Sequence, residues 1–123
     1  MSRILAISTH PDDETLGCGG TLLRHRDAGD VLFWLIVTET HAPQWSQESI
    51  ARRAKEVVQV AAQYGFEHTS KLGFPAARLD TVPQAELMDA IRGVVAEVRP
   101  EIVYLIHEGD VHSDHRAVFA AAM

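Results

Sequence analysis

The run VLFWLIV at residues 31–37 is apolar at all seven positions, and most of its residue types favour extended structure. A continuous apolar run of this length is typical of a strand that is covered on both faces, as in a parallel sheet. Residues 4–8 and 102–106 have the same character, and residues 68–73 form a weaker candidate. We therefore predict that these segments pair in one buried sheet.

Helical segments are predicted between these runs. Residues 46–64 and 87–98 place apolar side chains at helical spacing, and residues 15–28 are expected to form a first helix. Gly65 suits a helix C-terminus, and Pro100 stops the last helix. Strands that alternate with helices form parallel sheets through right-handed crossovers. The prediction is a single domain over residues 1–123 with a Rossmann-like α/β fold: a mainly parallel sheet of about four or more strands, with helices on both faces.

The composition excludes several classes of protein. With 46% hydrophobic and 23% charged residues among 123, the chain matches a globular domain that can bury a core. A single cysteine rules out a disulfide framework and fits a reducing compartment, so we expect a cytoplasmic protein. No apolar run approaches the roughly 18 residues of a membrane span. The net charge of −6 argues against nucleic acid and anionic membranes as partners.

The loop THPDDET at residues 9–15 follows the first predicted strand and precedes the first predicted helix. Ligands of open parallel sheets bind outside the carboxyl ends of the strands, which is where this loop is expected to lie. It carries one imidazole and three carboxylates at consecutive or near-consecutive positions, a charge density that favours a bound cation. The alternative is that Asp12 or Asp13 only caps the helix, because acids favour the positive end of the helix dipole.

The loop HEGDVHSDH at residues 107–115 has the same place after the last predicted strand. Together the two loops offer histidine and carboxylate ligands from the ends of two strands. Catalytic zinc takes three protein ligands and keeps an open position for water. The same donors suit ferrous iron or cobalt, and the sequence does not choose among these metals. The alternative is a solvated polar loop that binds no ion.

These residues resemble the PIG-L/LmbE-like zinc-dependent N-deacetylases. The resemblance rests on HPDDE at residues 10–14, LGCGG at residues 16–20 and HSDH at residues 112–115, and it covers essentially the whole chain. Members of that family hydrolyse acetamides, typically on N-acetylglucosamine-containing substrates. The resemblance therefore implies a metal-dependent hydrolase that removes the acetyl group from a small N-acetylated amino sugar. It implies Zn²⁺ as the cofactor, with Fe²⁺ or Co²⁺ as alternatives.

The resemblance also implies a role for individual side chains. The general base is Asp12, the first aspartate of its motif. His112 is expected to stabilise the oxyanion or to protonate the leaving amine, and Asp114 to hold the ring of His112. Arg53 matches an arginine that often faces the substrate, and the alternative for it is a solvated position on a helix face. The metal ligands that the resemblance implies are His10, Asp13 and His115.

The resemblance leaves several points open. Members of the family are considerably longer, so the chain is expected to be an N-terminal fragment that is truncated at its C-terminus. Two alternatives to a deacetylase are a metal-binding fragment without turnover and a relative that acts on a non-acetamide substrate, such as an unsaturated acid. Self-association into a homo-oligomer stays open. We expect His25, His41 and His68 to be ordinary surface or loop residues.

Overall fold

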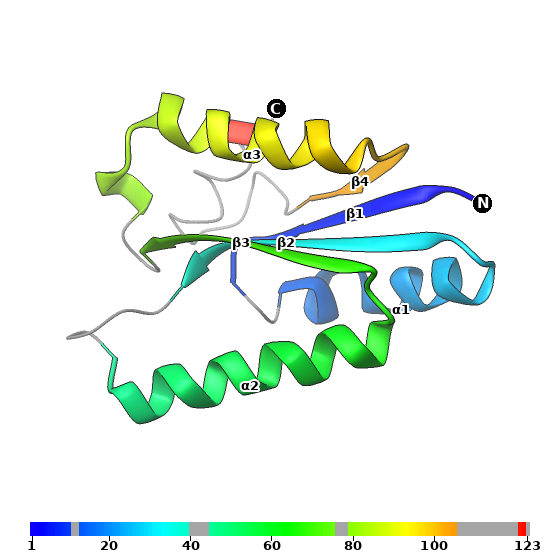
Figure 1. Ribbon diagram of the computed structural model, residues 1–123, viewed down its shortest axis with the longest axis horizontal. Coiled ribbons are helices and arrows are strands. Elements are labelled where there is room, and N and C mark those ends of the chain that lie inside the picture. Colours follow the sequence, from blue (N-terminus) through cyan, green and yellow to red (C-terminus); the bar gives the residue numbers. More distant parts are fainter. Residues whose placement is uncertain (11–12, 40–44, 76–78, 106–120, 123) are drawn as a thin grey trace.

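Four parallel strands form one sheet in the order β3-β2-β1-β4 (Figure 1). The computed structural model describes residues 1–10, 13–39, 45–75, 79–105 and 121–122, and for residues 13–18 and 80 it describes the backbone alone. The strands are β1 (Arg3–Ser8), β2 (Val31–Glu39), β3 (His68–Pro75) and β4 (Ile102–Tyr104). The helices are α1 (Asp13–Asp27), α2 (Gln47–Tyr64), α3 (Gln84–Val98) and the short 3-10 helix η1 (Leu79–Thr81). This arrangement confirms the predicted α/β fold.

Strand β1 lies between β2 and β4 and is buried along most of its length. Its pairing with β2 runs in parallel register from Arg3 opposite Val31 to Ser8 opposite Ile36. Its pairing with β4 is shorter and is also parallel. Because β1 has a neighbour on each side and a helix layer on each face, an apolar strand is the sequence that this position requires.

The side chains of the sheet divide into two cores, one on each face. Odd-numbered residues of β1 and β2 pack against α3, and even-numbered residues pack against α1 and α2. Figure 1 shows the same division, with α3 on one side of the sheet and α1 and α2 on the other. The core on the α3 side contains Leu5, Ile7, Phe33, Leu35 and Val37, with Leu87, Ile91, Val94 and Val98 of the helix. The core on the other side contains Ile4, Ala6, Leu32, Trp34 and Ile36, with Leu22, Val57 and Tyr64.

The helix ends follow the local signals in the sequence. Ser46 caps α2, because its side-chain oxygen accepts a hydrogen bond from the amide of Ser49 at 3.1 Å. Gly65 ends the same helix in the left-handed conformation, with φ of 73°. Arg99 ends α3 at a φ of 51°, directly before the proline that was expected to stop it. The predicted limits of both helices are therefore confirmed to within a few residues.

The two outer strands differ from the sequence-based expectation. Strand β3 is longer than predicted and has an irregular register between Ile36 and Thr38 of β2, where Gly73 adopts a φ of 75°. In β4 the side chains of Ile102 and Val103 are 39% and 42% exposed. The expectation that this strand is covered on both faces is wrong for these two residues. The physical reason is position, because β4 is the outer strand of the described sheet.

His25 is not the ordinary surface residue that the sequence suggested. Its Nδ1 atom lies 2.7 Å from Oδ2 of Asp30, and its Nε2 atom lies 2.7 Å from the hydroxyl of Tyr104. An ionised carboxylate only accepts hydrogen bonds, so Nδ1 donates to Asp30. Asp30 also accepts from the backbone amide of Ser2 at 2.8 Å. The network joins the last turn of α1 to the start of β1 and to β4. His41 lies outside the described residues, and His68 is exposed as expected.

None of the described helices is both long enough and apolar enough to cross a membrane. The longest of them, α2, carries charged residues along its exposed side, including Arg52, Arg53 and Lys55.

Asp30 gives a prediction for stability against pH. The hydrogen bond from the Ser2 amide, followed by that from His25, lowers the pKa of Asp30 below its ordinary value of 3.8. A lowered pKa in the folded state contributes stability above the unfolded-state pKa, and this contribution is lost as the pH falls through the folded-state pKa. We expect Asp30→Asn to lower the melting temperature at pH 7, as measured by circular dichroism, and the difference from the wild type to shrink as the pH falls well below 3.8.

The matched control is Asp27→Asn. The side chain of Asp27 is 74% exposed, and its Oδ1 atom lies 3.4 Å from Nη2 of Arg26. Exposed ion pairs of this kind contribute little to the free energy of unfolding. An Asp30→Asn variant that loses the same stability at pH 7 and well below pH 3.8 would contradict the role given to the charge.

Candidate functional site

The candidate site lies at the carboxyl edge of the sheet, where β1 ends and α1 begins. All four described strands are parallel, so their carboxyl ends meet at this edge, which is the usual ligand position in open α/β sheets. Ser8 ends β1, His10 follows two residues later, and α1 starts at Asp13. The β1–α1 connection therefore brings His10 and the first residue of the helix to the same corner of the molecule.

Hydrogen bonds from β2 hold the end of β1 in place. The carbonyl of Thr9 accepts two of them from Thr38, one from the backbone amide at 3.0 Å and one from Oγ1 at 2.7 Å. One residue earlier, the hydroxyl of Ser8 accepts a hydrogen bond from Nε1 of Trp34 at 2.8 Å. Thr9, Ser8 and Thr38 are all buried, although each is polar. The backbone is thus fixed by buried polar contacts directly before His10.

The hydroxyl of Thr9 differs from its neighbours. Thr9 is fully buried, and its Oγ1 atom has no hydrogen-bond partner among the residues that the structure describes. A buried polar atom without a partner costs about 1–3 kcal/mol. Such groups are rare in native proteins, and their explanations include stored strain, a catalytic role and a bound water or ion. This hydroxyl lies one residue before His10, so the end of β1 carries a locally destabilising group.

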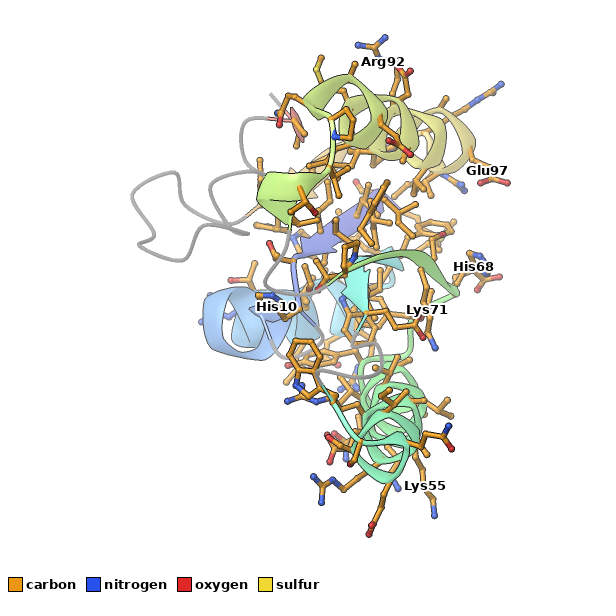
Figure 2. All side chains as sticks on the ribbon, turned by 90° about the vertical axis from the view of Figure 1, so that its left-hand side faces the viewer. His10, Lys55, His68, Lys71, Arg92 and Glu97 are labelled. Carbon is orange, nitrogen blue, oxygen red and sulfur yellow. The ribbon has the colours of Figure 1, made fainter. Side chains whose placement is uncertain are left out.

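His10 is half-buried at this edge. Figure 2 is turned so that the left-hand side of Figure 1, where the strands end, faces the viewer, and it shows His10 beside helix α1. His68, the other histidine that Figure 2 labels, begins β3 and so lies at the opposite edge of the sheet. Among the histidines of the described segments, His10 is therefore the one at the carboxyl edge.

The structure describes only part of the predicted set of site residues. His10 and the backbone of Asp13 lie at the carboxyl edge of the sheet, as expected. Arg53 is exposed on α2, a position that suits both a substrate contact and a solvated helix face. Within the described segments, no group of three or more His, Cys, Asp or Glu side chains gathers at one point. The remaining predicted residues, Asp12, His112, Asp114 and His115, lie outside the described residues.

The predicted donors have the chemistry of a zinc site. Histidine nitrogen and carboxylate oxygen are zinc ligands, and a set of two histidines with one aspartate leaves a position open for water. His10 meets a further requirement, because the peptide that leads into it is held by Thr38. The orphaned hydroxyl beside it adds a polar group without a described partner. By their chemistry, these residue types fit a metal ion.

Sequence analysis missed Thr9 and Thr38. Thr38 directly follows an apolar run, and Thr9 follows one after Ser8. Both are β-branched, so both suit the end of a buried strand. The signal that was available is the polar atom itself, because a hydroxyl at the ligand edge of a buried strand needs a partner. The sequence does not contain the register between β1 and β2. This register places residue 38 beside residue 9.

The strand order, the two helix layers and the candidate site beyond the strand ends define an open parallel α/β protein. The conserved protein TT1542 from Thermus thermophilus has the same fold. Its crystal structure superposes with a TM-score of 0.83 at 34% sequence identity, over 99% of this chain and 54% of that one. Residues 5–123 match the PIG-L family, GlcNAc-PI de-N-acetylase. The chain belongs to this family.

Two relatives show what the family includes. The deacetylase YaiS of Escherichia coli, whose function is uncharacterised, is 31% identical over 98% of this chain. The diacetylchitobiose deacetylase of Thermococcus kodakarensis is 30% identical over 94% of this chain. The chain spans 65% of the first relative and 46% of the second.

The orphaned hydroxyl gives a prediction for stability. Thr9→Val replaces the hydroxyl with a methyl group of similar size, which removes a buried polar atom that has no described partner. We expect the free energy of unfolding to stay level or to rise by about 1–2 kcal/mol, as measured by urea unfolding. A loss of more than about 1 kcal/mol would show instead that the hydroxyl has a partner in the folded protein.

Proposed function

We propose that this chain carries the metal site of a hydrolase that removes the acetyl group from an N-acetylglucosamine-type substrate. The observation that carries the proposal is the β1–α1 corner, where His10 follows a buried strand and α1 begins at Asp13, in a chain of the PIG-L family. The named relatives support the reaction class, because the Thermococcus kodakarensis protein is a diacetylchitobiose deacetylase.

We assign the metal ligands to His10, Asp13 and His115. His10 lies in the connection between β1 and α1, and Asp13 begins α1, so only two residues separate these two ligands in the chain. Zn²⁺ suits the set, and Fe²⁺ or Co²⁺ would also fit it. When bound, such an ion supplies a Lewis acid and lowers the pKa of its bound water to about 7.

The proton transfers belong to the chain's own side chains. Asp12 takes the proton of the attacking water, because it is next to a ligand without being one. His112 stabilises the developing oxyanion or delivers a proton to the amine nitrogen, so that the C–N bond breaks and acetate leaves. Asp114 holds the ring of His112 in position. The products are acetate and a free amino group.

The substrate is a small N-acetylated amino sugar. A relative from Bacillus anthracis, 28% identical over 94% of this chain, is a probable N-acetyl-alpha-D-glucosaminyl L-malate deacetylase. With the Thermococcus protein, it supports an acetamido sugar as the group that is recognised. Arg53 offers an exposed positive charge on α2 for a polar substrate group.

The metal assignment is tested with His10→Ala. Removing one of three ligands should abolish stoichiometric zinc, measured by elemental analysis after dialysis, while the circular dichroism spectrum stays that of the wild type. The control is His68→Ala, which removes an exposed histidine at the opposite edge of the sheet and should keep the metal. Full zinc occupancy in His10→Ala would refute the assignment.

The base assignment is tested with Asp12→Asn. The variant keeps the size of the side chain but cannot accept a proton, so acetate release from N-acetylglucosamine derivatives should fall by about two to four orders of magnitude. Its zinc content should equal that of the wild type. Retained metal with near-normal turnover would contradict the base role, and lost metal would make Asp12 a ligand.

A further inference from the structure

Thr38 makes a contact that the fold alone does not require. It ends the apolar run of β2, is 3% exposed, and directs both its amide and its hydroxyl at the carbonyl of Thr9. The hydrogen bond from the Thr38 amide, at 3.0 Å, already continues the pairing of the two strands. The Thr38 hydroxyl is a second hydrogen-bond donor to the same carbonyl oxygen, at 2.7 Å, and this oxygen has two lone pairs to accept both.

The carbonyl that Thr38 holds belongs to the peptide unit that carries His10. The six atoms from the α-carbon of Thr9 to the α-carbon of His10 lie close to one plane. Two donors on the oxygen therefore fix the plane, and with it the position of the His10 α-carbon. On the other side of His10, Pro11 restricts the residue before it to extended conformations. Constraints thus act on both sides of this residue.

The burial of this contact points the same way. Thr9 is held where its own hydroxyl has no described partner, and that unpaired hydroxyl costs stability at the end of β1. Residues that break a local rule are expected at functional sites, where another requirement decides the residue. A fixed Thr9–His10 peptide is such a requirement if the imidazole of His10 must coordinate a metal ion in one geometry.

We propose that Thr38 is a positioning residue for the metal site, which acts through the Thr9 carbonyl on the backbone of His10. The inference rests on the proposed function, because it takes His10 as a ligand. Thr38 itself need not touch the metal or the substrate. Residues that orient a metal ligand without contacting the metal themselves typically change metal affinity by about 10–100-fold when they are removed.

The test uses two substitutions of Thr38 in the same protein. Thr38→Val keeps the branched shape and the backbone amide but removes the hydroxyl donor, and Thr38→Ser restores the donor on a smaller side chain. Zinc affinity is measured by competition with a chromophoric chelator. The order parameter of the His10 amide is measured in the metal-free protein by ¹⁵N relaxation, which does not depend on metal binding.

The control is Trp34→Phe, four residues earlier on β2. It removes the buried hydrogen bond from Trp34 to Ser8 between the same two strands, and it leaves the Thr9 carbonyl untouched. It therefore reports what a general weakening of this strand pair does to zinc affinity. Melting temperatures of all variants show that each one folds.

We expect Thr38→Val to weaken zinc binding by about 10–100-fold. It should also lower the His10 order parameter from about 0.85 towards 0.6. Thr38→Ser should restore both. Unchanged values in Thr38→Val, or an equal loss of affinity in Trp34→Phe, would overturn the positioning role and leave the proposed function standing. A wild type that binds no zinc, with an ordered His10, would overturn the proposed function and this role with it.

Discussion

The parallel pairing of β1 with a strand on each side is the constraint on which the rest of the structure depends. Ile4 lies opposite Leu32 of β2 and opposite Ile102 of β4, so one strand sets the register of three. Parallel strands place all their carboxyl ends at one edge, and the candidate site lies there between two apolar cores. Thr9 and Thr38 are in contact for this reason, although 29 positions separate them in the sequence.

The elements could be predicted from the sequence because their signals are local. The apolar run at residues 31–37 and the helical spacing at residues 46–64 each specify one element without reference to another. The contact from Thr38 to Thr9 could not be predicted, since it depends on the register between two strands. The same holds for the contact between His25 and Tyr104, which are 79 positions apart. In the candidate site, the position of the connection between β1 and α1 was predictable, but the buried hydrogen bonds that fix the backbone were not.

The polar contacts of the described residues fall into two groups with different consequences. At the amino edge of the sheet, Asp30 accepts from Ser2 and His25, and Arg3 donates to the carbonyl of Val98 at 2.7 Å. These groups are paired and tie helices to strands. At the carboxyl edge, the hydroxyl of Thr9 is buried without a described partner. Paired contacts thus stabilise both edges, since Trp34 and Thr38 also donate to Ser8 and Thr9, and the unpaired hydroxyl distinguishes the carboxyl edge as a candidate ligand site.

The central claim is that this edge binds a metal ion through His10. The most direct measurement is anomalous X-ray diffraction at the zinc absorption edge from crystals of the zinc-loaded protein. The account predicts a single dominant peak about 2.0–2.2 Å from a ring nitrogen of His10. A zinc ion held elsewhere, for example by His25 with Asp30 or by His68, with His10 unbound, would contradict it.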